Sequence, residues 1–474
     1  MSGFFGCVSK KECVADVFYG TDYHSHLGTK RAGMAFYTGG RFVRSIHSLE
    51  NSYFRTKFED DLGRFAGSRM GIGVISDTES QPITLTSHLG RFAVVTIGRI
   101  DNIEQITAQL LNERVNFAEL SDSTINATEL VAILVSRADS FEEGIRRVND
   151  TIKGSCSYLI LTDHGIYACR DKFGRTPVVI GKNESGYVAA TESSSFTNLG
   201  YELVRDLGAY EAVFMTDEGI KTVVPAGRRK QVCSFMWVYY GYPSSYYEGI
   251  NVEQTRYHCG GALARRDAGQ LEEIDYVAGI PDSGIGHAVG YSNEKRVSYK
   301  RAFVKYTPTW PRSFMPANQN MRDLVAKMKL IPNRELTDGA KIVFLDDSIV
   351  RGTQLKDNVC KLFEAGAKEV HIRIACPPLV FPCTFINFSA SRSSFDLIAR
   401  RVIRQLEGTE DFSEETLQKY ADPDSEQYAR MVETMRREMG LTSLRFMRLD
   451  DLVRAIGLPK EELCTHCWDN SSEM

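Results

Sequence analysis

The stretch KIVFLDDSIVRGT, residues 341–353, decides the fold of the second half of this chain. Residues 342–345 form a continuous apolar run with a β-branched pair, which predicts a strand buried on both faces. Two acidic residues, Asp346 and Asp347, follow directly, and residues 355–363 then carry apolar side chains at helical spacing. The pattern is therefore a strand, an acidic turn and a helix. In open α/β sheets, ligands bind at such turns, beyond the carboxyl ends of the strands.

The turn itself carries polar groups suited to a phosphorylated ligand. Ser348, Thr353 and the backbone N–H groups near Gly352 come where a helix N-terminus begins, which is a natural binding site for a phosphate group. The two adjacent carboxylates suit ribose hydroxyls or a hydrated Mg²⁺ ion. A bare Asp-Asp pair could instead be an ordinary strand end with solvated acids and a helix cap.

The whole run resembles the phosphoribosyl pyrophosphate (PRPP) motif of the type I phosphoribosyltransferases. The resemblance implies an α/β type I phosphoribosyltransferase domain, which we place at residues 231–474. It implies that Asp346 and Asp347 hold the ribose hydroxyls and Mg²⁺. It further implies that the 5′-phosphate is bound by Ser348, Arg351, Gly352 and Thr353.

The composition narrows the classes of partner. The chain has 474 residues, a net charge of −4 and 43% hydrophobic residues, which gives no reason to expect nucleic acid or an anionic membrane as partner. No apolar run approaches the length of a membrane span and the N-terminus lacks a signal-like segment, so we expect a cytoplasmic protein. Its 11 cysteines should then stay reduced, and clustered ones favour metal binding over structural disulfides.

Residues 2–230 alternate short strands with a few helices, which predicts an α+β domain with much antiparallel sheet. Residues 2–6 (SGFFG), residues 170–177 (RDKFGRTP) and residues 190–193 (ATES) resemble the class II glutamine amidotransferase domain, an N-terminal-nucleophile fold. Enzymes of that fold use the first residue as nucleophile and its α-amine as base. Removal of the initiator methionine would place Ser2 in that role. The expected strands are 92–97, 158–161, 178–180, 187–190 and 212–215, and the expected helices are 129–136 and 141–148.

Four departures from that family fall on its glutamine chemistry. Ser2 stands where the family has cysteine, and a serine hydroxyl is the poorer nucleophile at neutral pH. Ile97 precedes Gly98 where the family has the asparagine of its oxyanion hole, and losing one such donor costs roughly 3 kcal/mol of barrier. Ala127 stands where an aspartate grips the substrate amine, and the arginine expected near residues 71–76 is absent. We therefore expect the fold to be kept and the glutaminase to be inactive.

The second half resembles the amidophosphoribosyltransferase family from residues 233–240 (CSFMWVYY) and 248–252 (EGINV) onward. That family joins an amidotransferase fold to a phosphoribosyltransferase and catalyses the first step of purine biosynthesis. The resemblance implies PRPP and an amine as substrates, Mg²⁺ as cofactor, nucleotide feedback inhibitors and a homo-oligomer.

A second turn of the phosphoribosyltransferase half should hold pyrophosphate. Residues 276–280 predict a buried strand, and the turn PDSG follows it. The resemblance implies that Asp282 and Ser283 bind PRPP there, with Ser283 near Mg²⁺. It also implies that Lys305 and Arg312 come from a loop that closes over PRPP and assists the departure of pyrophosphate. The plain alternatives are a turn into a helix cap and a solvated basic loop.

A Cys-x-x-Cys pair, Cys464 and Cys467, lies near the C-terminus. A zinc site, a redox pair and chance all compete as explanations for it. The resemblance implies more, since iron–sulfur members of the family ligate a [4Fe–4S] cluster with four cysteines. The matching positions are Cys233, Cys383, Cys464 and Cys467. Zinc in the same pocket remains the rival ligand.

Two functions thus stay open. The first is an amidophosphoribosyltransferase-like enzyme in which an amine, with ammonia the favoured one, displaces pyrophosphate from PRPP. The alternative is a PRPP-binding regulator or structural partner that no longer catalyses. The basic loop and the run Met328-Lys329-Leu330 persist, which a pure sensor need not keep, and this favours the enzyme.

Overall fold

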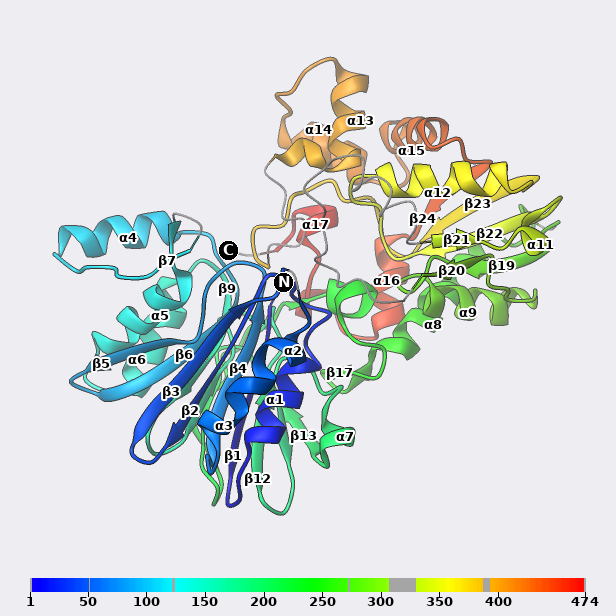
Figure 1. Cartoon of the computed structure of the whole chain (residues 1–474). Helices are drawn as coiled ribbons and strands as arrows, with labels where there is room; N and C mark the ends of the chain where they lie inside the picture. Colours follow the sequence, from blue (N-terminus) through cyan, green and yellow to red (C-terminus); the bar gives the residue numbers. More distant parts are fainter. Residues whose placement is uncertain are drawn as a thin grey trace.

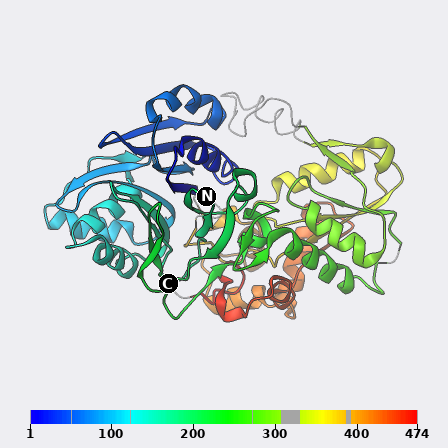
Figure 2. The same cartoon turned by 90° about the horizontal axis from the view of Figure 1, so that it is seen from below.

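The computed structural model describes residues 2–50, 52–121, 124–271, 273–306, 330–386 and 393–472. Figures 1 and 2 show two halves side by side, with the N-terminus close to the junction between them. Among the described residues, no helix has both the length and the apolar character needed to cross a membrane.

The N-terminal half is built on two antiparallel sheets that pack face to face. The first has the strand order β13-β11-β12-β1-β4-β2-β3, so the strand that follows the N-terminus lies in the middle of it. Its bounds are β1 (Gly3–Ser9), β2 (Arg31–Thr38), β3 (Arg41–Ser48), β4 (Met70–Ser76), β11 (Val179–Lys182), β12 (Gly186–Ala190) and β13 (Glu202–Asp206). The second, of order β15-β14-β10-β9-β6-β5, comprises β5 (Ile83–Ser87), β6 (Gly90–Ile100), β9 (Gly154–Leu161), β10 (Ile166–Cys169), β14 (Ala212–Met215) and β15 (Ile220–Val224).

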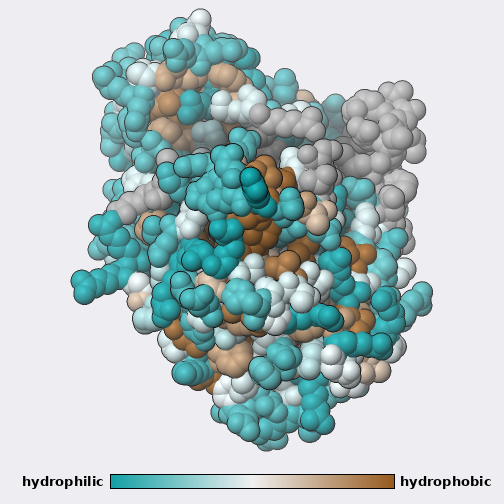
Figure 3. Space-filling view, turned by 90° about the vertical axis from the view of Figure 1, so that its left-hand side faces the viewer, coloured by the Kyte–Doolittle hydropathy of each residue, from teal (hydrophilic) through white to brown (hydrophobic). Residues whose placement is uncertain are grey.

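Helices cover the outer faces of both sheets. The apolar residues between the sheets, such as Phe4 and Val74 from the first and Val95 and Leu159 from the second, form one buried cluster. The helix α1 (Val14–Asp22) packs on the outside of the first sheet, and α4 (Ile103–Asn112), α5 (Ala127–Ser136) and α6 (Phe141–Thr151) pack on the outside of the second. Figure 3 shows the molecule from the left-hand side of Figure 1, where the surface is mainly hydrophilic and apolar residues gather near its middle. The α+β fold expected for this half is confirmed.

The C-terminal half has a parallel sheet of order β19-β22-β23-β24. Its strands are β19 (Tyr276–Gly279), β22 (Lys341–Asp346), β23 (Glu369–Ile374) and β24 (Ser443–Phe446). Figure 1 shows α12 (Thr353–Glu364) on one side of this sheet and α8 (Val252–Arg266) and α9 (Ile285–Lys295) on the other. Residues 342–345 of the central strand are fully buried, as their apolar run predicted. Further elements are β20 (Phe303–Lys305), β21 (Leu330–Pro332), α13 (Ile398–Glu407), α14 (Glu414–Ala421), α15 (Glu426–Glu438) and α16 (Leu449–Ile456).

The end of the chain returns to the segment that joins the two halves. The short strand β16 (Val232–Cys233) pairs in parallel with β25 (Leu463–Cys464), which precedes α17 (His466–Asp469). The backbone N–H of Gln231 donates to Phe173 O at 2.7 Å, so this segment also lies on the residue 170–177 run of the first half. The proposed domain boundary near residue 230 falls between the end of β15 and this strand pair.

Candidate functional site

The acidic pair lies at the carboxyl end of β22, where the parallel sheet predicts a ligand site. Ser283 Oγ donates to Asp346 Oδ1 at 2.9 Å, and the backbone N–H of Asp347 reaches the same oxygen at 2.9 Å. The N–H of Ser348 donates to Asp347 Oδ1 at 2.6 Å. We call residues 281–284 the pyrophosphate turn after the ligand expected there; it is joined directly to the acidic turn, although Ser283 and Asp346 are 63 residues apart.

Burial makes this pair costly to ionise without a cation. Burial raises the pKa of Asp346 to about 6, although its hydrogen bonds with Ser283 and Asp347 act in the opposite direction. The pKa of Asp347 is raised well above its ordinary range, first by burial and then by the adjacent Asp346 charge, while Arg256 opposes the shift. A divalent cation would relieve this repulsion, because it favours the ionised form of both carboxylates. The donor chemistry thus fits Mg²⁺, a cation that prefers oxygen ligands.

The loop after the acidic pair ends at a helix N-terminus. Gly352 has a φ of +79°, a left-handed conformation that favours glycine, and α12 starts at the next residue, Thr353. The first backbone N–H groups of a helix lack intrahelical partners and attract anions. The Arg351 side chain is exposed, with its Nη2 atom 3.7 Å from Asp396 Oδ2. This geometry can bind a phosphate group.

The pyrophosphate turn packs tightly against the acidic strand. A β-carbon built on Gly284 would lie 2.0 Å from Leu345 O, so a side chain at this position would push the two turns apart. The peptide bond between Pro281 and Asp282 is cis. Lys305, the last residue of β20, forms an ion pair with Asp282 in which both side chains are substantially exposed. Exposed pairs contribute only about 0–1 kcal/mol, so Lys305 can leave Asp282 for a phosphate oxygen at little cost. Arg312, predicted beside it, lies outside the described residues.

The structure brings the four predicted cysteines together near the junction of the halves. Cys233 and Cys464 are opposite each other in the β16–β25 pair. The C=O of Cys467 accepts the N–H groups of Val380 at 3.2 Å and Phe381 at 3.1 Å, which ties the loop bearing Cys383 to α17. A hydrogen bond with Cys383 and burial both raise the pKa of Cys467. The pKa of Cys233 is raised by burial and then by Cys464 and Cys383.

These thiols fit a thiolate-bound cluster in their chemistry. All four are buried and free of disulfide bonds. Among the described residues, no group of three or more Cys, His or acidic side chains is set around the position of a single metal ion. The Arg175 guanidinium opposes the burial that raises the pKa of Cys464, so a cation already favours the thiolate there. Four grouped thiols match the ligand set of an iron–sulfur cluster.

The structure describes Ser2, Ile97 and Ala127, three of the positions at which the sequence departs from the glutamine amidotransferase pattern. Ser2 is buried, with its Oγ 3.3 Å from Ser76 Oγ. Ile97 is 3% exposed and packs in the core between the two sheets, where it offers no donor. Asn126 accepts the first N–H groups of α5 as its N-cap, and the next residue, Ala127, has no polar side chain.

Sequence reasoning missed the charged residues that connect the halves. Arg170 Nη1 lies 2.7 Å from Glu248 Oε1, and Lys230 Nζ lies 2.9 Å from Glu248 Oε2. Glu192 accepts from Tyr247 OH at 2.6 Å. The run 170–177 and residues 190–193 stood out by their resemblance, but these partners are distant in sequence and carry no periodic signal.

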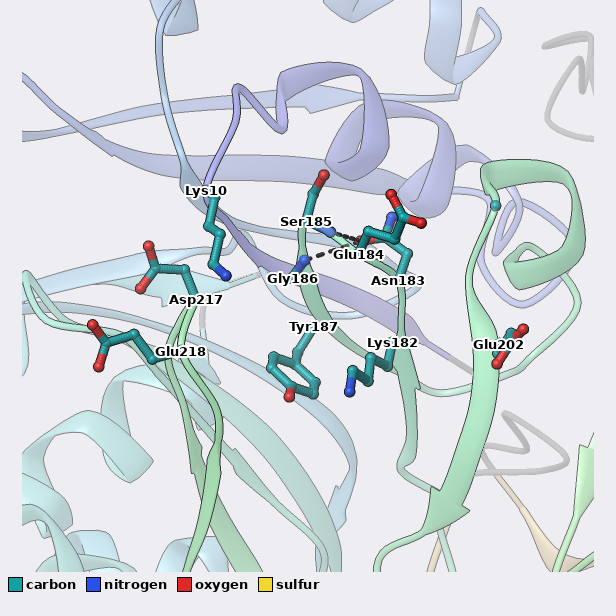
Figure 4. A pocket seen from close by; sticks show the side chains of 11 residues that line it. Lys10, Lys182, Asn183, Glu184, Ser185, Gly186, Tyr187, Glu202, Asp217 and Glu218 are labelled. Atoms are coloured by element: carbon teal, nitrogen blue, oxygen red, sulfur yellow. Dashed lines mark hydrogen bonds between the residues drawn. The ribbon is translucent and has the colours of Figure 1, made fainter.

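An open hollow of about 940 Å³ lies elsewhere, at hairpin tips of the N-terminal half (Figure 4). It is lined by the β11–β12 turn from Lys182 to Tyr187 and by Lys10, Gly200, Glu202, Asp217 and Glu218. None of these is a residue that the sequence predicted for the site. Its mixed charges give no consistent chemistry for a ligand.

Known proteins resemble this chain over both of its halves. A glutamine amidotransferase domain model matches residues 68–198. The amidophosphoribosyltransferase of Archaeoglobus fulgidus is 32% identical over 368 residues, which is 76% of this chain and 79% of the relative. That of Bacillus subtilis is 28% identical over 98% of this chain and 92% of the relative. The solved B. subtilis glutamine PRPP amidotransferase, complexed with ADP and GMP, superposes with a TM-score of 0.84 at 27% identity, covering 99% of this chain and 96% of that one.

Proposed function

The chain belongs to the amidophosphoribosyltransferase family, and from this premise we propose that it is an ammonia-dependent enzyme whose glutaminase half is inactive. The observation that carries the transferase part is the Ser283–Asp346 hydrogen bond of 2.9 Å, because it joins a pyrophosphate turn to a buried acidic pair at one sheet edge. In this reaction an amine attacks the anomeric carbon of PRPP and pyrophosphate leaves.

The residues of the phosphoribosyltransferase half divide the work of binding. Asp346 and Asp347 would hold the ribose hydroxyls and Mg²⁺, and the loop from Ser348 to Thr353 would hold the 5′-phosphate by its N–H groups. Bound Mg²⁺ would supply positive charge that stabilises the departing pyrophosphate. Lys305 would leave its exposed pair with Asp282 and neutralise the same leaving group.

Ammonia as donor follows from the state of the N-terminal half. Glutamine hydrolysis needs a nucleophile, an oxyanion hole and a grip on the amino-acid end of the substrate. Ser2 weakens the nucleophile, buried Ile97 offers no side-chain donor, and Ala127 offers no carboxylate for the substrate amine. These changes strike separate functions, so one compensating substitution cannot restore activity. We infer that the half persists for its contacts with the transferase half.

We also propose a [4Fe–4S] cluster on Cys233, Cys383, Cys464 and Cys467. What supports it is the burial of four thiols around one strand pair and one short helix. Zinc bound by the same four thiols is the rival occupant, and metal analysis distinguishes the two. Nucleotide feedback is proposed by analogy with the B. subtilis protein, which was solved with ADP and GMP.

Pyrophosphate release from PRPP tests the proposal in three parallel reactions, with ammonia, with glutamine and with neither. We expect release with ammonia and none above background with glutamine. Ser2→Ala should match the wild type in all three. Glutamate formation from glutamine that Ser2→Ala abolishes would contradict the inactive glutaminase, and PRPP binding without any release would favour a non-catalytic regulator.

A further inference from the structure

One segment between the halves contacts both the N-terminal domain and the elements of the PRPP site. We call residues 236–247 the connector. It begins as a π-helical turn, Met236–Tyr240, and ends in the short strand β17 (Tyr246–Tyr247). Its first part is held by the transferase half and its last part by the amidotransferase-like half.

In the N-terminal half, the connector is held by Glu192, whose side chain is fully buried. Its Oε1 accepts from Tyr247 OH at 2.6 Å and from the N–H of Tyr242 at 3.2 Å. Its Oε2 lies 3.1 Å from His26 Nε2. Burial alone would raise the pKa of Glu192, but His26 and Tyr247 bring it below its ordinary value. A buried, multiply bonded carboxylate of this kind fixes the position of the groups that donate to it.

In the transferase half, the connector is held by Arg256 on α8, which is 5% exposed. Its guanidinium donates to three connector carbonyls, those of Trp237 at 3.1 Å, Tyr239 at 3.0 Å and Gly241 at 2.8 Å. Arg256 therefore ties the backbone of the connector to α8.

The connector also touches the helix that starts at the pyrophosphate turn. His287 Nε2 on α9 lies 3.3 Å from Val238 O. The helices α8 and α9 meet backbone to backbone, because a β-carbon on Gly260 would lie 1.9 Å from His287 O and one on Gly290 would lie 2.1 Å from Tyr257 O. With no side chain between them, a shift of α8 carries α9 along.

We propose that Glu192 and Arg256 are positioning residues, which hold the pyrophosphate turn and the acidic pair ready for PRPP by fixing the connector between the two halves. The inference rests on the proposed function and extends it, since it gives the catalytically silent N-terminal half a part in PRPP binding. Neither side chain need contact substrate.

Amide exchange of the ligand-free protein tests this directly, in the segments 279–286 and 345–350. The variants are Tyr247→Phe, which removes only the hydroxyl that donates to Glu192, and Arg256→Lys, which keeps a charge but lacks the planar fork of nitrogens that spans the three carbonyls. We expect exchange in both segments to rise about tenfold in each variant, as local opening becomes easier. With PRPP and ammonia, the KM for PRPP should rise more than kcat falls.

Glu211→Gln is the matched control, because Glu211 is a buried carboxylate of the same half whose side chain bonds to Arg205, Gly208 and Thr222, none of which belongs to the connector. It should leave exchange in both segments unchanged. The inference is overturned if both test variants exchange like the wild type, or if the control has the same effect. That result does not depend on turnover, so failure of the proposed ammonia reaction is seen separately, in the pyrophosphate assay of the wild type.

Discussion

Replacing Asp347 by asparagine should weaken PRPP binding while stabilising the free protein. Asp347 is 5% exposed, so water screens little of any contact that its carboxylate makes. Hydrogen bonds to charged groups contribute about 1.5–3 kcal/mol. The loss therefore corresponds to roughly a 10- to 150-fold weaker affinity for PRPP with Mg²⁺.

The effect on stability has the opposite sign. In the free protein, burial and the neighbouring Asp346 both raise the pKa of Asp347, so its ionised form is unfavourable in the folded state. Asparagine removes that charge with nearly the same shape, and the repulsion of Asp346 disappears. The melting temperature without ligand should rise.

Titration calorimetry with PRPP and Mg²⁺, run beside thermal melting of the free protein, measures both quantities. Weaker binding together with a higher melting temperature is the expected pair. Equal affinity in variant and wild type would refute the role of Asp347. Weaker binding with a lower melting temperature would show that the variant is merely misfolded.

Three further predictions concern the cysteines, Ser2 and Asp206. Protein purified without oxygen should be brown. The variant Cys464→Ser should lose the colour and be less stable, while Cys360→Ser, at an exposed cysteine, should keep both colour and stability. Metal analysis that finds stoichiometric zinc and no iron would exclude the cluster. Ser2→Ala should leave ammonia-supported turnover unchanged, and a large loss in that assay would show that Ser2 takes part. Burial and then Glu248 raise the pKa of Asp206 to about 6, so its contribution to stability falls as pH rises from about 4 to about 6. Asp206→Asn should therefore raise the melting temperature more at pH 7 than at pH 4, and an equal rise at both would count against this pKa.

The sequence predicted local features of the site well. The apolar run 342–345 is a buried strand, and α12 follows the acidic turn, as the helical spacing of residues 355–363 predicted. The expected strands and helices of the first half also appear, for example β6 around residues 92–97 and α5 around 129–136. These features depend on neighbouring residues, whose spacing and conformational preferences are visible in the chain.

Features that depend on distant pairing were not predictable. The Arg256 side chain serves three carbonyls that lie up to 19 residues away, and nothing in the helical pattern of α8 marks it. Glu192 meets Tyr247 across 55 residues. The gathering of the four cysteines was an implication of family resemblance, since C-x-x-C spacing alone could not bring Cys233 opposite Cys464.

We propose that the nitrogen transferred to the ribose comes from ammonia and not from glutamine. The most direct measurement supplies PRPP, Mg²⁺, ¹⁵N-labelled ammonium and an excess of unlabelled glutamine together, and then determines the isotope in the trapped phosphoribosyl product by mass spectrometry. We expect a product that carries ¹⁵N, with no glutamate formed. Unlabelled nitrogen in the product, accompanied by an equal amount of glutamate, would contradict it.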